Sequence, residues 1–286
     1  MAIPTDPSPS TPRGVDPALI RTIRQASQSS ATDFGLLMAQ AGQESGFRPD
    51  AKAATGSAAG LFQFIDSTWL DMVHRFGAKY GAADLADKIK IDDSGKPTVA
   101  DPATRQQILA LRSDPTLSAS LAGEYAKLNK DEVERAIGHP IGRADVYMAH
   151  FLGAGGATQF LKALETKGGT VAADLLPDAA ASNRSVFYDG DTGRAKTVSE
   201  IYRALGGRIE QDARDYGGAP EATAADSSLA GANPSDAYAG MRRNFAGLQL
   251  SPAVAGMLDN LTLAALKLVN SATPVLSNGR RANTQS

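Results

Sequence analysis

The stretch Ala39–Ala51, AQAGQESGFRPDA, ends an apolar helical pattern and places a carboxylate where that pattern continues. A stripe of apolar residues at helical spacing precedes the carboxylate: Phe34, Leu37, Met38 and Ala41. One further turn of the stripe reaches Glu44 and Ser45, and the chain then leaves the helix through Gly46 and Pro49. Burial disfavours the charged form of a carboxyl group, so a glutamate here is suited to hold a proton and act as a general acid. The alternative is a surface glutamate at a fraying helix end.

The remaining pattern predicts a mainly α-helical protein. Apolar residues recur at helical spacing in nine segments: 17–28, 33–45, 67–77, 103–112, 117–129, 131–138, 144–153, 156–166 and 198–205. Asp16 and Asp66 are expected to be N-caps. Residues 46–60 and 84–100 are expected to be loops, the second turning at DDSGKP, and residues 185–188 a short extended piece before a DGDTG turn.

Composition divides the chain into four parts. Residues 1–15 are rich in Pro, Ser and Thr and are expected to be a disordered lead-in to a domain at 16–215. Residues 216–238 are typical of a flexible linker. The segment 239–286 contains an apolar helical pattern that begins after Ser251 and Pro252. This helix either packs back on the domain or docks on a partner.

Charge and hydropathy exclude several classes of partner. The 286 residues carry a formal net charge of -2, so we expect no nucleic-acid partner. The most apolar C-terminal run, 261–266, is far shorter than the roughly 20 residues that span a bilayer, so we expect a soluble protein with no membrane span. The N-terminus lacks the basic and apolar regions of a secretory signal. The chain contains no cysteine, which rules out disulfides and thiolate chemistry within it.

The run ESGFRPDAKAATGSAAGLFQF, 44–64, closely resembles the signature of the soluble, lysozyme-like type of lytic transglycosylase domain. That signature has Glu-Ser followed by Phe, Pro and Ala, and then Gly-Leu-Met-Gln. The resemblance implies a lysozyme-like α-helical catalytic domain in which Glu44 is the single catalytic acid and base. It also implies that Gln63 lines the sugar-binding cleft and that Ser45 lies beside the acid. Phe62 stands where the family usually has Met and keeps an apolar wall for a sugar ring.

A third motif of the family, Ala-Tyr-Asn-x-Gly, is matched only in its frame by AHFLG, 149–153. His150 replaces the Tyr and Phe151 the Asn. The family Tyr is thought to orient the acid through a hydrogen bond, and an imidazole can donate a similar bond. Tyr147, one turn earlier, is the alternative source of a phenol. For His150 a role as a core or cleft-wall histidine stays equally open.

The resemblance implies cleavage of the β-1,4 bond between N-acetylmuramic acid and N-acetylglucosamine in peptidoglycan strands. Ordinary glycosidases use two carboxylates, but a transglycosylase takes the C6 hydroxyl of its own substrate as nucleophile and forms a 1,6-anhydromuramoyl end. Asp50 and Asp66, the candidates for a second carboxylate, are interpreted as structural. No metal or cofactor is expected, since His74, His139 and His150 lack ligand spacing. Trp69 is expected in the core, with a sugar platform as its alternative, and Asn183 is expected to cap a turn.

Two other functions compete with this one. The first is a lysozyme-like muramidase that uses Glu44 with an activated water. The second is a non-catalytic peptidoglycan-binding assembly protein whose C-terminal helix docks a component of an envelope machine, such as a flagellar or secretion system. Our hypothesis combines cleavage with localisation by the C-terminal helix. The substrate places the protein in the periplasm or cell envelope, by an export route that the sequence leaves open.

Overall fold

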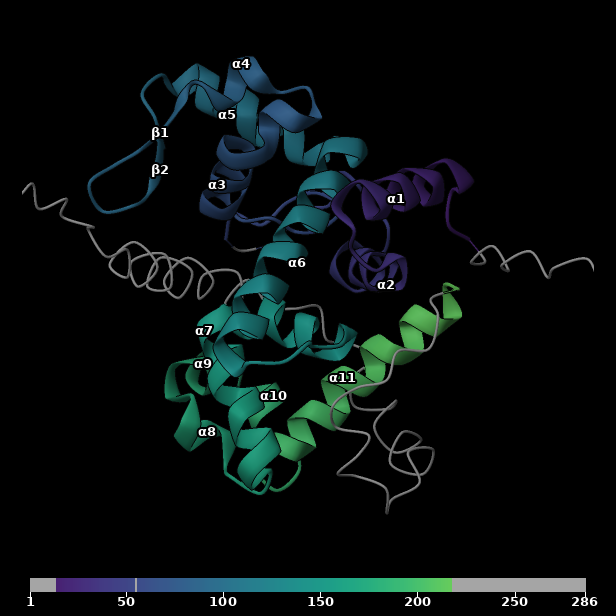
Figure 1. Cartoon of the computed structure of the whole chain (residues 1–286), viewed down its shortest axis with the longest axis vertical. Helices are drawn as coiled ribbons and strands as arrows, with labels where there is room; N and C mark the ends of the chain where they lie inside the picture. Colours follow the sequence, from purple (N-terminus) through teal and green to yellow (C-terminus); the bar gives the residue numbers. More distant parts are fainter. Residues whose placement is uncertain (1–13, 55, 218–286) are drawn as a thin grey trace, which may run out of the picture.

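The computed structural model describes residues 14–54 and 56–217, and these are mainly α-helical, as predicted (Figure 1). The predicted linker beyond Gly217, the C-terminal helix and most of the lead-in lie outside the described residues. The α-helices are α1 (Pro17–Ser30), α2 (Phe34–Ser45), α3 (Asp66–Phe76), α4 (Ala83–Ala86), α5 (Pro102–Ala110), α6 (Pro115–Ile137), α7 (Arg143–Lys167), α8 (Ala172–Leu175), α9 (Pro177–Ser182), α10 (Arg184–Phe187) and α11 (Val198–Asp215). Two 3-10 turns, Gly77–Tyr80 and Leu111–Ser113, follow α3 and α5.

Aspartates cap the two helices that lead to the acid. The Asp16 carboxylate accepts a hydrogen bond of 2.8 Å from the amide of Ala18 and so begins α1 as predicted. Asp33 accepts one of 2.6 Å from the amide of Leu36 at the start of α2. The prediction for Asp66 was wrong, because Ile65 is the N-cap of α3 and Asp66 is the first helical residue. Its carboxylate is bound by arginines instead of by backbone amides.

Three segments differ from the sequence prediction. The two helices expected at 117–129 and 131–138 are one helix, α6, because the polar residues at their junction, Asn129 to Glu132, continue the helix as buried and half-buried positions rather than as a break. The loop expected at 84–100 contains α4 and an antiparallel hairpin, β1 (Ile89–Ile91) and β2 (Pro97–Val99), with DDSGKP at its turn. Residues 184–187 are helical rather than extended, while Tyr188 bridges to Ala195 across the DGDTG turn.

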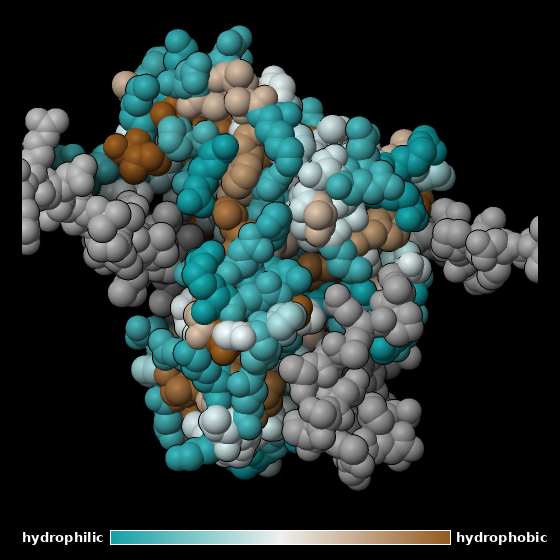
Figure 2. Space-filling model, in the orientation of Figure 1, coloured by the Kyte–Doolittle hydropathy of each residue, from teal (hydrophilic) through white to brown (hydrophobic). Residues whose placement is uncertain are grey.

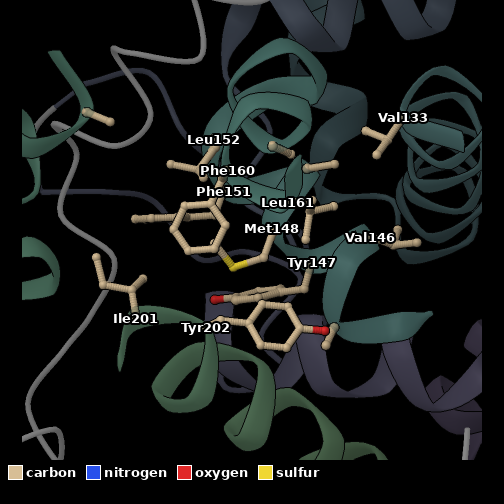
Figure 3. Close-up of a cluster of buried hydrophobic side chains, with 14 of the residues drawn as sticks. Val133, Val146, Tyr147, Met148, Phe151, Leu152, Phe160, Leu161, Ile201 and Tyr202 are labelled. Atoms are coloured by element: carbon tan, nitrogen blue, oxygen red, sulfur yellow. The ribbon is translucent and has the colours of Figure 1, made fainter. Parts of the chain in front are cut away.

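Two buried apolar clusters meet at α2. One lies among α1, α2, α3 and the first half of α6. The other lies among the second half of α6, α7 and α11 with the short helices α8–α10, and part of it is drawn in Figure 3. Leu36 and Ala39 of α2 belong to the second cluster, while Leu37, Met38 and Ala41 belong to the first. Because α2 is apolar on several sides, it lies between the two halves, and its last turn is held at their junction.

Helix α7 changes direction at Gly153, whose φ of 71° and ψ of 159° are not helical. A side chain with a Cβ rarely adopts this positive φ, so glycine permits the kink. The sequence predicted two helices separated by the glycine cluster here, and the kink confirms the break. The segment before Gly153 carries His150 and Tyr147.

Polar residues cover most of the face shown in Figure 2. Within the described ranges, Ile91 on β1 is the large apolar side chain that is clearly exposed, at 44%.

Candidate active site

Glu44 and His150 face each other across the junction of the two halves. The Nε2 atom of His150 on α7 lies 3.3 Å from Oε1 of Glu44 at the end of α2. The Glu44 side chain is 6% exposed and that of His150 is 21% exposed. The structure therefore brings together the predicted acid and the residue that replaces the family Tyr. This geometry allows a proton to be shared or donated between imidazole and carboxyl group.

A pocket lies between α2, α6 and the loop before α3, and His150 of α7 forms part of its wall. Its walls are mainly apolar and aromatic, with amide, hydroxyl and imidazole groups among them. The lining residues are Gln40, Phe62, Gln63, Phe64, Ile65, Thr68, Ala122, Tyr125, Ala126 and His150. Three of the predicted site residues, Phe62, Gln63 and His150, are thus gathered around one space, and Gln40 lies one helical turn before Glu44.

The rings of two tyrosines flank the imidazole of His150. The Tyr147 ring is nearly parallel to it, with 6.2 Å between centroids, and the Tyr125 ring meets it edge-on at 6.3 Å. Burial raises the pKa of the Tyr147 phenol above its usual range, and the nearby negative charge of Glu44 raises it further. The phenol therefore stays protonated. In the described part of the chain it makes no hydrogen bond to Glu44, so His150 rather than Tyr147 contacts the acid.

The side chains of Ser45 and Gln63 form hydrogen bonds with the protein backbone. The Ser45 hydroxyl donates to the carbonyl of Ala41 and accepts from the amide of Arg48, which closes the end of α2. The Gln63 Nε2 group donates to the carbonyls of Ala51 and Gly60, at 3.2 and 2.8 Å, while the residue itself adopts a left-handed φ of 47°. Both residues thus shape the loop between Glu44 and Gln63, and their contact with substrate stays a prediction.

Arg112 holds this loop from the opposite side, a role that the sequence analysis missed. Its guanidinium donates to the carbonyls of Ser57 and Phe64 and to the carboxylate of Asp66, at 2.6, 3.0 and 2.9 Å. The backbone of Gly60 approaches Arg112 so closely that a Cβ would lie 2.1 Å from the arginine carbonyl oxygen. No local pattern marks Arg112, because its partners are about 50 positions away.

Three other carboxylates were compared with Glu44, and two of them are bound by other side chains while the third is exposed. Asp66 is bound by Arg105 and Arg112, at 2.7 and 2.9 Å, and Asp50 is exposed in the loop. Asp212 on α11 accepts a hydrogen bond of 2.7 Å from Gln43, the residue before Glu44. Burial raises the pKa of Asp212 above its usual value. These contacts give Asp66 and Asp212 structural roles.

Trp69 and Asn183 are also held inside the protein. Trp69 is fully buried, and its Nε1 donates to the carbonyl of Ile108 at 2.7 Å. It therefore packs in the core, as expected, and presents no sugar platform. The Asn183 side chain donates to the carbonyl of Ala179 at the end of α9. Within residues 14–54 and 56–217, His, Asp and Glu do not gather in groups of three or more that could hold a metal ion.

Gln40 and Tyr125 are two of the pocket residues that sequence reasoning did not single out. A signal for Gln40 was available, because it stands four residues before Glu44 and so shares its helix face. Tyr125 carried no such signal, since it lies within the long helix α6 and reaches the site through the packing of α6 on α7.

One segment of the chain matches a known protein family. Residues 21–90 match the family described as "Transglycosylase SLT domain". The match includes α1, α2, the loop held by Arg112 and α3, and it ends before α6 and α7. Proteins with this domain act as transglycosylases on peptidoglycan, so the matched segment indicates a cell-wall substrate. None of the helices in the described ranges has the length and apolarity that a membrane span requires. The segment 21–90 is therefore similar to a lysozyme-like domain of the lytic transglycosylase type.

Proposed function

We propose that this protein is a peptidoglycan lytic transglycosylase in which Glu44 is the single acid and base. The observation that carries the proposal is the placement of Glu44. It lies at the end of a helix inside the matched segment, its side chain is 6% exposed, and it contacts His150, which lines a pocket with mainly apolar walls.

In the proposed reaction the protonated Glu44 donates its proton to the β-1,4 glycosidic oxygen between N-acetylmuramic acid and N-acetylglucosamine. The bond between C1 and that oxygen breaks, and its electron pair stays with the oxygen of the departing glucosamine. The muramic acetamido group assists at C1. The C6 hydroxyl oxygen of the same muramic residue then bonds to C1, and its proton returns to the Glu44 carboxylate. The product is a 1,6-anhydromuramoyl end, and no water is added.

The surroundings of the other carboxylates support a reaction with one acid. A hydrolase needs a second carboxylate to act as nucleophile or to activate water. Asp66 is neutralised by two arginines, and Asp212 is bound to Gln43 on the side of α2 that faces α11. In this proposal His150 positions the Glu44 carboxyl group, which is the role that the family Tyr is thought to have.

We also propose that cleavage serves local remodelling of the cell wall in the periplasm or envelope while an envelope machine is assembled. This part rests on the composition of residues 216–286, where a linker is followed by an apolar helical pattern. Its test is a chain that ends at residue 238. This chain should keep its rate on purified peptidoglycan and lose its localisation in cells, and unchanged localisation would contradict the docking role.

The test of the reaction is mass spectrometry of muropeptides released from purified peptidoglycan by the wild-type protein and by Glu44→Gln. Anhydromuropeptides from the wild type and none from the variant are expected. Products with ordinary reducing ends would instead identify a muramidase. If nothing is released, the non-catalytic binding and assembly function takes the place of this proposal.

A further inference from the structure

Gln40 is a mostly buried residue that lines the pocket, and its amide has no hydrogen-bond partner among the described residues. Gln40 lies on α2 one turn before Glu44, is 3% exposed and lines the pocket that His150 also lines. Within the part of the chain that the structure describes, its side chain makes no hydrogen bond. A polar group that faces a pocket without a partner in the protein is open to a ligand or a water molecule, which completes its hydrogen bonds.

The two neighbouring glutamines are bound differently. Gln43 on the same helix donates to Asp212 on α11. Gln63, across the pocket, has its Nε2 group committed to the carbonyls of Ala51 and Gly60. Gln40 is therefore the amide at this site that retains both its donor and its acceptor for a bound molecule.

The pocket suits an uncharged polar group with a small apolar end. Its lining contains no Lys, Arg, Asp or Glu among the described residues, so no charged group would be paired there. Phe62, Tyr125 and Ala126 supply apolar walls next to the Gln40 amide. An acetamido group has one N–H donor, one carbonyl acceptor and a methyl group. The carbonyl oxygen of a glutamine amide can accept a hydrogen bond from this N–H while an apolar wall contacts the methyl group, and the acetamido carbonyl oxygen is left to assist at C1.

We propose that Gln40 is a specificity residue that binds the acetamido group of the amino sugar held beside Glu44. This inference rests on the proposed function, since it names the part of the substrate that the same site recognises. The acetamido group is attached to C2, next to the C1 atom at which the bond breaks. Because Gln40 and Glu44 are one helical turn apart, a sugar bound through this group has C1 within reach of the acid.

Binding, rather than cleavage, tests this inference. All proteins carry Glu44→Gln in the full chain, so that no substrate is turned over. Isothermal titration calorimetry compares the β-1,4 tetramer of N-acetylglucosamine with the β-1,4 tetramer of glucose. These sugars share a backbone and differ at C2. We expect the parent to bind the N-acetylated tetramer roughly tenfold more tightly, the size of effect given by one or two hydrogen bonds.

Gln40→Leu should bring this ratio close to one, whereas the matched control Gln43→Leu, on the same helix, should leave it unchanged. Gln40→Met keeps the length of the side chain without its amide and serves if the leucine variant does not fold. A ratio that survives loss of the Gln40 amide, or a parent protein that binds neither tetramer, overturns the inference. The experiment measures binding rather than cleavage. Preferential binding of the N-acetylated tetramer would therefore support the role of Gln40 even if the wild-type protein released no anhydromuropeptides.

Discussion

The Nε2 atom of His150 lies 3.3 Å from Oε1 of Glu44, and this contact joins residues 106 positions apart. The two side chains come from α7 and α2, and each of these helices contacts α6. The family match ends at residue 90, so half of the pair lies outside the matched segment. Any rate enhancement that depends on orienting Glu44 therefore depends on the packing of the whole helical body.

Replacement of His150 should slow the reaction more than it weakens substrate binding. His150→Phe keeps a ring between Tyr125 and Tyr147 but removes the hydrogen bond to Glu44, so kcat should fall by about 10- to 100-fold with KM changed less. His150→Tyr restores a donor and should recover most of the rate. The measurement is the rate of anhydromuropeptide release.

The control for this experiment is His139→Phe, because His139 is exposed and is bound to Glu165 away from the site. Equal losses in His139→Phe and His150→Phe, or a tyrosine variant as slow as the phenylalanine variant, would show that the imidazole does not position the acid.

Removal of the Arg112 guanidinium should destabilise the loop that connects Glu44 to Gln63. Arg112→Met leaves two carbonyls and the Asp66 carboxylate without their shared donor, so we expect a loss of about 3 kcal/mol in the free energy of unfolding. Arg105→Met also removes a partner of Asp66, but its side chain is 38% exposed, and the loss should be below about 1 kcal/mol. Urea unfolding of the two variants measures the difference, and similar midpoints would count against the anchoring role.

Alanine substitutions at Gly60 and Gly138 distinguish the cost of a strained backbone from the cost of a steric clash. Both have positive φ, 83° and 94°, but a Cβ on Gly138 would meet nothing within 4 Å, whereas one on Gly60 would lie 2.1 Å from the carbonyl oxygen of Arg112. Gly138→Ala should therefore cost about 1 kcal/mol through strain, and Gly60→Ala at least about twice as much. Thermal unfolding provides the comparison. If the two variants melt together, the loop can shift away from Arg112 without cost.

Asp212 should make the protein less stable as pH rises, because desolvation of its carboxylate outweighs the attraction of Arg208, whose Nε atom lies 3.8 Å away. Burial raises its folded-state pKa, so the folded protein binds this proton more tightly than the unfolded chain does. Stability then falls as pH rises from about 4 through the folded pKa. Asp212→Asn removes this titration, so its stability relative to wild type should increase with pH in that window and then become constant.

Urea unfolding of Asp212→Asn and wild type at several pH values between about 4 and 7 measures this effect. The asparagine can still accept the hydrogen bond from Gln43, which limits other losses. A difference between the two proteins that does not change with pH would mean that Asp212 is not destabilised by burial in the folded state.

Much of the local structure followed from short patterns in the chain. Asp16 with Pro17 predicted the start of α1, and the glycines around Gly153 predicted a break in α7. The errors came where tertiary contacts outweighed local preference. Asp66 has the usual chemistry of an N-cap, yet two arginines bind its carboxylate. Residues 89–99 were too polar and too short to indicate strands, but they pair around the DDSGKP turn, and Ile89 packs in the core.

The sequence by itself determined the helical class, the position of Glu44 at the end of an apolar stripe, and the resemblance that makes Glu44 and Gln63 candidate site residues, because these depend on residues close together in the chain. Only the tertiary structure decided that His150 rather than Tyr147 contacts the acid, that Arg112 holds the loop, and that Gln40 keeps a free amide at the pocket. The physical reason is that hydrogen bonding and burial at these positions are set by the packing of helices far apart in sequence, which no local periodicity records.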